Sequence, residues 1–247
     1  MKSKALFAVS LLILAGCGNS SKNQLPLPLL RFGGMKGDVA KVKESTYDAV
    51  EKFGDIYPDE LNQVFVTEYT SNGRPKSYAA YDYDGDWNYK YENSYEGDRC
   101  IKTVTHQRYG NTTTEMVFVE GRKNYEKWAN TTDGKTTYTE IFYEGLKQIS
   151  KDEEGNTVFE LEVDKEGRPI DQKNYNNGEI VYRRRCQYDA KGLLSKTTEY
   201  FSATDGRPEI HTYSYPEFDK RGNWITQHVF TDDGEATYVI KREITYR

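Results

Sequence analysis

Apolar and polar residues alternate along most of this chain. Near the end of the chain, Tyr238, Ile240 and Ile244 alternate with Lys241 and Glu243. A period of two with one apolar side is typical of a strand in a half-buried sheet. The pattern therefore predicts an all-β fold.

Fourteen glycines, from Gly73 to Gly234 and including Gly121, recur every 10–16 residues and mark the predicted turns. Many stand in Asn-Gly or Asp-Gly pairs, which supply the positive φ that tight hairpins require. Loops this short join only antiparallel neighbours. We therefore expect an antiparallel meander of about 14 strands.

A sheet of this size rarely stays open. Open sheets seldom exceed about ten strands without curling or splitting. We expect the sheet to curl into a barrel, a half-barrel or a wound β-shell. A porin-like membrane span is disfavoured, because strands such as 182–186 carry charge on both faces.

The start of the domain is ambiguous. In residues 38–53, apolar side chains recur at spacings of three and four, which suits a helix. The frequent Val, Thr and Tyr favour a strand instead, and we lean towards the strand. Residues 54–62, with Pro58, are expected to form a loop.

The N-terminus has the features of a lipoprotein signal. Lys2 and Lys4 precede an apolar stretch that is too short to span a bilayer, and Leu14–Cys17 follows. This last segment resembles the lipobox of bacterial lipoproteins, which implies a lipid on Cys17. We expect a signal peptide at 1–16, a linker at 17–37 and a single β-domain at 38–247. The protein would then be anchored in the cell envelope, with the outer membrane as the expected site, on its periplasmic side or at the cell surface.

Composition narrows the possible functions. The net charge is −5, and the chain contains 21 Tyr but no basic stripe beyond Arg183–Arg185. Nucleic acid is therefore not an expected partner. An oxidising envelope permits a disulfide between Cys100 and Cys186, but we favour two buried free thiols, because the two residues lie several hairpins apart.

One short motif recurs in the second half of the chain. The motif consists of an aromatic residue, Asp, two turn residues, Gly and an apolar residue. It occurs at Tyr188–Leu194 and at Phe218–Ile225. Val163–Ile170 has Val in place of the aromatic residue, and Tyr83–Trp87 is a shortened copy. On these residues the chain resembles YD-repeat (RHS-type) proteins. The resemblance implies hairpins wound into a shell and no catalytic residues. Large members enclose a toxin, whereas this chain is too short for a large enclosure.

The motif has a physical explanation of its own. Its Asp can accept hydrogen bonds from the amides of the turn, and its Gly can adopt a left-handed conformation. We therefore interpret Asp189 and Asp219 as structural residues.

Other candidates for chemistry are weak. The three histidines, His106, His211 and His228, lack a third ligand at a telling spacing, although His211 and His228 could lie diagonally on adjacent strands. Asp82, Asp84 and Asp86 alternate like calcium ligands but lack the later Glu of an EF-hand loop. No cofactor or metal is expected.

Aromatic residues form the best candidate binding site, which comprises Tyr81, Tyr83, Trp87, Tyr89, Tyr91 and Trp224. The odd numbering of the first five places most of them on one face if the turn preserves the register. Exposed rings with polar tips suit sugars or protein partners, whereas buried rings would simply form the core of a sheet that is poor in aliphatic residues.

These features predict a non-catalytic envelope lipoprotein that binds a glycan, a peptide or a protein partner. A structural or assembly role in the envelope is the alternative. A glycan hydrolase is less favoured, because it needs two carboxylates set across a cleft.

Overall fold

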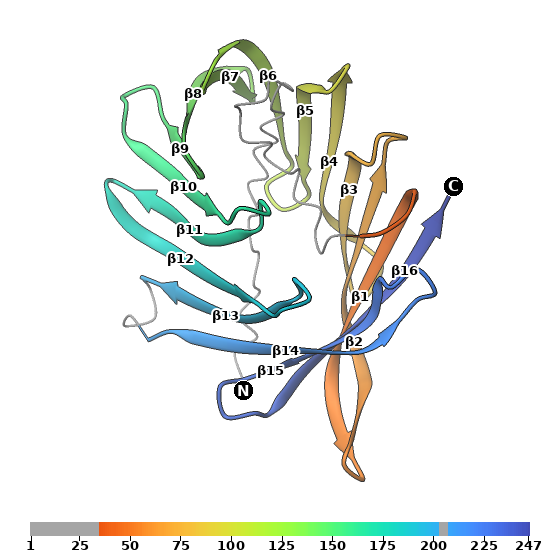
Figure 1. Ribbon diagram of the computed structural model, residues 1–247. Coiled ribbons are helices and arrows are strands. Elements are labelled where there is room, and N and C mark those ends of the chain that lie inside the picture. Colours follow the sequence, from red (N-terminus) through yellow and green to blue (C-terminus); the bar gives the residue numbers. More distant parts are fainter. Residues whose placement is uncertain (1–34, 203–206) are drawn as a thin grey trace.

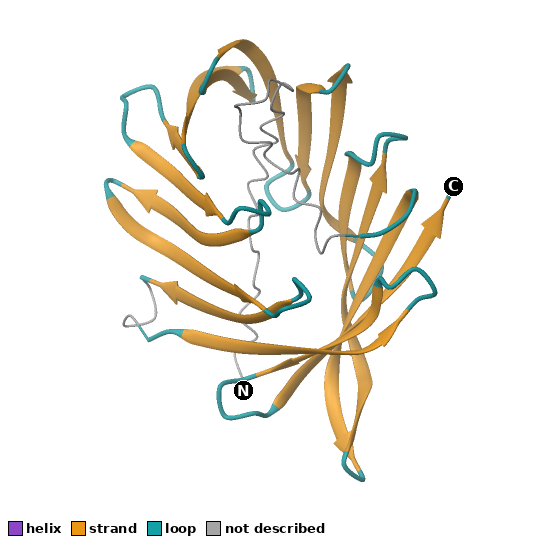
Figure 2. Ribbon diagram, in the orientation of Figure 1, coloured by secondary structure: helices purple, strands orange, loops and turns teal. Residues whose placement is uncertain are grey.

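The computed structural model describes residues 35–202 and 207–247, and every regular element in these ranges is a strand (Figures 1 and 2). The strands are β1 (Val39–Lys52), β2 (Asp55–Tyr69), β3 (Pro75–Asp82), β4 (Trp87–Glu96), β5 (Arg99–Gln107), β6 (Thr112–Arg122), β7 (Tyr125–Thr132), β8 (Lys135–Glu144), β9 (Lys147–Lys151), β10 (Thr157–Val163), β11 (Pro169–Asn176), β12 (Glu179–Tyr188), β13 (Leu194–Phe201), β14 (Glu209–Phe218), β15 (Trp224–Phe230) and β16 (Ala236–Tyr246). In the described part of the chain, no helix is long and apolar enough to cross a membrane.

Each strand pairs antiparallel with the next, and β16 pairs with β1, so the meander closes into a barrel. The closing register places Arg242 opposite Glu44. The predicted all-β meander is confirmed, and of the three shapes considered the barrel is the one formed. The strands number sixteen rather than about 14, because the fourteen turns predicted from glycine separate fifteen strands and the ambiguous segment at 38–53 adds β1.

The first hairpin agrees with the sequence-based expectation only in part. Residues 39–52 form a strand, as expected, but the loop expected at 54–62 is wrong because β2 begins at Asp55. Phe53 and Gly54 alone make the turn, with φ values of 57° and 85°. Pro58 can lie within β2 because that part of the strand has only one neighbour.

Glycine marks most of the turns, with one clear exception. Gly121 lies within β6, and Asn124 takes the left-handed conformation in the following turn with φ 63°. A Cβ atom on Gly121 would lie 2.9 Å from Cζ of Phe118. Glycine is needed at this position because an aromatic ring covers it, not because the chain turns there. Gly206 lies outside the described residues.

The two faces of the sheet differ in chemistry. One face carries many of the most buried side chains, among them Tyr91, Trp128, Ile141 and Thr197. Side chains converge and cover one another on the concave side of a closed sheet, so this face is the inner one.

Charged pairs between adjacent strands line the outer face, for example Lys43 with Glu243 and Arg183 with Asp171. Glu160 lies between Lys147 and Lys173 in the same manner. A lipid-facing band could not hold such rows of charge, so the outer face suits water.

Among the described residues, buried apolar side chains form three separate clusters, and others such as Tyr91, Trp224 and Val239 are buried outside them. One surrounds Cys100, Trp128 and Ile141, and another is built on Phe159, Leu161 and Val163. The third joins Met35 to Val39, Val42 and Tyr69. Met35 belongs to the segment assigned to the linker, so barrel packing begins before residue 38; the signal peptide and Cys17 lie outside the described residues.

The two described cysteines are not paired with each other. Cys100 is fully buried in β5, and Cys186 is partly buried in β12. The disulfide that an oxidising envelope permits between them is therefore not formed, and Cys186 is less buried than expected.

Candidate functional site

A five-residue turn recurs around the barrel and explains the sequence motif. At Asp164, Asp189 and Asp219, the amide of the Asp donates to the carbonyl four residues later, and the amide of the Gly donates back to the carbonyl of the Asp. The carboxylate oxygen Oδ1 also accepts two further amides, which for Asp189 are those of Lys191 and Leu193 at 2.9 and 2.8 Å. The structural interpretation of Asp189 and Asp219 is therefore confirmed.

The shortened copy of the motif begins two residues earlier than the sequence pattern predicts. The same pair of backbone bonds joins Asp82 to Asp86 and Gly85 to Asp82, so Asp82 rather than Asp84 begins the turn. The matching motif is therefore Tyr81-Asp82 followed by Gly85. Thr70 and Thr231 begin turns with the same pattern, which shows that a hydroxyl residue can replace the Asp.

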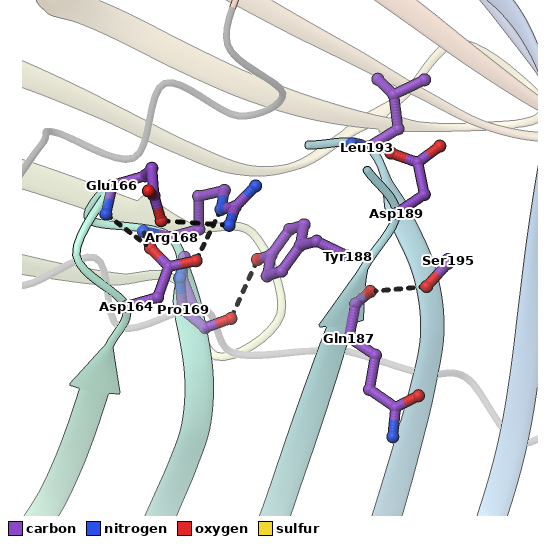
Figure 3. A network of polar contacts seen from close by, with 9 residues as sticks. All are labelled: Asp164, Glu166, Arg168, Pro169, Gln187, Tyr188, Asp189, Leu193 and Ser195. Carbon is purple, nitrogen blue, oxygen red and sulfur yellow. Dashed lines mark hydrogen bonds and ion pairs between the residues drawn. The ribbon is translucent and has the colours of Figure 1, made fainter. Parts of the chain in front are cut away.

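Tyrosines from a neighbouring strand fasten three of these turns. The hydroxyl of Tyr188 donates to the carbonyl of Pro169 at 2.9 Å, and the guanidinium of Arg168 lies 4.6 Å from the centre of the Tyr188 ring (Figure 3). Tyr95 repeats this arrangement with Pro75 and Arg74. Tyr215 donates to the carbonyl of Leu194 in the same way. These tyrosines are structural, and their hydroxyls are engaged within the fold.

The structure separates the candidate aromatic residues between the two faces. Ala80 opposes Tyr89, whereas the next pair is Tyr81 with Trp87, so Asn88 is an extra residue in a β-bulge. Trp87 therefore joins Tyr81 on the outer face, while Tyr89 and Tyr91 face inward. The expectation that most of the odd-numbered rings share one face is wrong for this reason.

The inward rings pack against one another. Tyr91 stacks on Tyr78 with ring centres 5.3 Å apart, and Tyr78 stacks on Phe65 at 5.8 Å. Burial raises the pKa of both tyrosines well above the usual range. Tyr91 is 4% exposed, so its place is in the packed interior.

Trp224 lies elsewhere on the barrel and is 6% exposed. Its ring packs against Tyr215 at 5.6 Å, and the guanidinium carbon of Arg242 lies 3.3 Å from its centre. Arg242 is in turn paired with Glu44 at 2.7 Å. These contacts place Trp224 in the seam where the two ends of the barrel meet.

A different set of aromatic residues lies on or beside two neighbouring turns. We name Tyr81, Tyr83, Trp87 and Tyr109 the aromatic rim. Tyr83 is 73% exposed in the β3–β4 turn, and Tyr109 is 66% exposed in the β5–β6 turn. Tyr81 and Trp87 are partly exposed and directly paired.

The two turns of the aromatic rim are held together by polar contacts. Asp86 pairs with Arg108 at 2.6 Å, and the amide of Arg108 donates to the carbonyl of Asn88 at 2.9 Å. Asp82 accepts hydrogen bonds from the side chains of Asn88 and Tyr109. Sequence reasoning missed Tyr109, because only the register of the barrel brings the two turns together.

The histidines considered as metal ligands do not share a site. His228 opposes Ser214, and the alternation along β14 and β15 puts its side chain on the opposite face from His211. Among residues 35–202 and 207–247, no three His, Cys, Asp or Glu side chains are arranged to hold a metal ion.

One buried carboxylate stands apart from these sites. Glu126 faces inward and accepts hydrogen bonds from Nε1 of Trp128 at 3.2 Å and the hydroxyl of Tyr143 at 3.3 Å. Burial raises the pKa of Glu126, and these two donors offset the rise only in part. Because its hydrogen-bond partners belong to the core, we interpret Glu126 as a structural residue.

Comparison with known proteins shows only distant likenesses. No protein-family model matches the chain and no curated protein matches its sequence, so the resemblance to YD-repeat proteins gains no support. Among solved structures, a porin-like protein from Bacteroides uniformis is 12% identical, with a TM-score of 0.49 over 84% of this chain and 98% of that one.

Two further structures are comparably remote. A porin-like protein from Bacteroides vulgatus is 12% identical, with a TM-score of 0.43 over 86% of this chain and 99% of that one. A LolA superfamily protein from Nitrosomonas europaea is 7% identical, with a TM-score of 0.35 over 90% and 91%. Likenesses at this level say nothing about the ligand.

Proposed function

We propose that this protein is a non-catalytic, lipid-anchored envelope protein that binds a neutral glycan at its aromatic rim. The observation that carries the proposal is the presence of four aromatic residues on or beside two contacting turns, with Tyr83 and Tyr109 mostly exposed. Flat rings with polar tips stack on the apolar faces of sugars and leave their hydroxyls free to hydrogen-bond.

The charges around the rim support a neutral ligand. Asp82, Asp84 and Asp86 lie in or beside the β3–β4 turn, against the cations Arg108 and Lys90. Carboxylates accept hydrogen bonds from sugar hydroxyls, but they repel anionic sugars. An uncharged glycan therefore suits this surface better than a uronic acid or a phosphorylated glycan.

The same contacts support a binding role rather than hydrolysis. Asp82 is engaged by Asn88 and Tyr109, and Asp86 is paired with Arg108. Carboxylates held in this way by turn contacts are not set across a sugar as an acid and a base must be.

The anchor is part of the proposal and rests on the sequence. A lipid on Cys17 would hold the barrel at a membrane surface without a spanning segment. The charged outer face supports an aqueous position for the barrel itself.

Tryptophan fluorescence tests the glycan proposal directly. Trp128 and Trp224 are 3% and 6% exposed, whereas Trp87 is partly exposed at the rim, so a bound sugar should change the emission of Trp87 alone. We expect a saturable change with at least one of maltoheptaose, cellohexaose and linear mannan fragments, and none in Trp87→Phe. Calorimetry should show that Tyr83→Ala and Tyr109→Ala each weaken binding roughly two- to tenfold.

Tyr138→Ala is the control, because Tyr138 is also an exposed tyrosine but lies on β8, away from the rim. It should bind as the wild type does. If no neutral glycan changed the fluorescence or released heat, the proposal would be wrong.

A further inference from the structure

The β1–β2 hairpin extends beyond the barrel as a two-stranded ribbon (Figure 1). The pairing of β1 with β16 ends at Asp48, and the pairing of β2 with β3 ends at Gln63. Between these points, residues 49–62 pair with no strand other than β1 and β2 themselves. An isolated two-stranded ribbon is marginally stable in water, so its length is not explained by the barrel.

The turn at the end of this ribbon exposes a large apolar side chain. Phe53 exposes its whole side chain, and Tyr57, which follows in β2, is 44% exposed. A Cβ atom placed on the neighbouring Gly54 would meet nothing within 4 Å. Among the described residues, therefore, no packing partner accounts for the phenylalanine.

Phe53 also occupies a conformation that disfavours it. Its φ of 57°, followed by 85° at Gly54, corresponds to the two-residue turn for which Asn-Gly is the preferred pair. Positive φ is unusual for a bulky residue. Asparagine would stabilise the turn and phenylalanine does not, so the aromatic side chain is explained better by a contact outside the fold.

The shaft of the ribbon carries strong negative charge. Residues 48–62 hold five carboxylates and one lysine, a net charge of −4. An anionic membrane surface would repel this segment. A second copy of the chain is also a poor match, because the whole protein has a net charge of −5.

The edges of the ribbon favour recognition by side chains over strand addition. Pro58, Asp59 and Glu60 lie along β2 where no neighbouring strand other than β1 covers it. Proline and charge on an exposed edge are features that block pairing with a further strand. The remaining mode of contact is insertion of the tip.

From these observations we infer that the β1–β2 ribbon docks onto a partner protein, with Phe53 inserted into an apolar pocket whose rim is basic. A central aromatic anchor surrounded by complementary charge is a common arrangement in protein interfaces. This interaction is separate from glycan binding at the aromatic rim and does not depend on it.

The test begins with a photo-reactive phenylalanine analogue at position 53 of the full chain in intact source cells, and the same analogue at exposed Asp232 as the control. The protein captured specifically at position 53 is then produced separately and titrated against purified variants. We expect Phe53→Asn to weaken its binding roughly thirtyfold, while Tyr138→Asn leaves it unchanged.

Folding and charge are measured on the same variants. Phe53→Asn should raise the Tm because Asn suits the turn, so a loss of binding could not be blamed on misfolding. Replacing Asp55, Asp59 and Glu60 by their amides should slow association and reduce its dependence on salt.

Several results would overturn the inference. These are the absence of a specific adduct at position 53, an adduct with a second copy of the chain, and a captured protein that binds Phe53→Asn as tightly as the wild type. Phe53-dependent binding to vesicles of phosphatidylethanolamine and phosphatidylglycerol would assign the tip to a membrane instead. Glycan titrations with Phe53→Asn keep the two proposals distinguishable, because the aromatic rim is intact in that variant.

Discussion

A single carboxylate organises each Asp-based turn of the barrel. Asp219 is the most heavily used, since it accepts hydrogen bonds from the amides of Arg221 and Asn223, the side-chain amide of Asn223 and the hydroxyl of Tyr246. Through Asn223 and Tyr246, the same turn is joined to Lys36 at the start of the described chain and to β16 at its end. One acidic side chain therefore ties three distant segments together.

Asp219→Ala should destabilise the protein by about 2 kcal/mol, because it leaves several donors of the turn without their acceptor. Asp219→Asn should cost less, since it keeps one acceptor oxygen. Urea denaturation at neutral pH compares the two, and equal stability of the alanine variant and the wild type would contradict this account.

The contribution of Asp219 to stability should depend on pH. Burial alone would raise the pKa of Asp219, but the hydrogen bonds from Tyr246, Asn223 and Arg221 outweigh it and hold the pKa below its ordinary value. The stabilisation is therefore present above about pH 4, the ordinary pKa of Asp, and is lost as the pH falls through the lowered value. The advantage of the wild type over Asp219→Asn should stay constant from about pH 7 to about pH 5 and shrink below about pH 4.

Bulges and covered glycines decide how individual strands present their side chains. In β4 the extra residue Asn88 turns Trp87 outward, away from Tyr89. In β6 the ring of Phe118 lies over Gly121, in a strand whose register also shifts between Phe118 and Glu120. The bulge and the covered glycine are both local features of the sequence. Their effect on side-chain orientation can be seen only when the neighbouring strand is in place.

Gly121→Ala should destabilise the barrel by about 1–2 kcal/mol, because the added methyl group would overlap the Phe118 ring. Phe118→Leu removes the ring and should cost stability by itself. The double variant should be more stable than the sum of the two single effects predicts, and thermal unfolding measures that coupling. Strict additivity would show that the ring is not the cause.

The barrel as a whole depends on the seam between β1 and β16. These strands are far apart in the sequence, and Arg242 with Glu44 joins them on the inner face beside Trp224. The side chain of Arg242 is 5% exposed, so its charge relies on this partner. Closure of the ring thus involves a partly buried ion pair as well as backbone hydrogen bonds.

Glu44→Gln should destabilise the barrel by about 3 kcal/mol, because it leaves the Arg242 charge buried without its carboxylate. The double variant Glu44→Leu with Arg242→Met should recover much of that loss, since two apolar side chains need no pairing. Lys43→Gln is the matched control, because Lys43 pairs with Glu243 across the same seam on the exposed face. Its effect should lie within about 0.5 kcal/mol of zero.

Alternation, turn chemistry and the recurrent Asp-Gly motif are local properties, so the all-β meander and the structural role of Asp189 and Asp219 could be derived from the chain alone. The separation of Trp87 from Tyr89 could not, because one bulged residue reverses the face of every side chain beyond it. Pairing between strands places Tyr109 at the candidate site and Trp224 away from it. The closure of β16 on β1 likewise depends on contacts between residues as far apart as Glu44 and Arg242, and no short stretch of sequence records them.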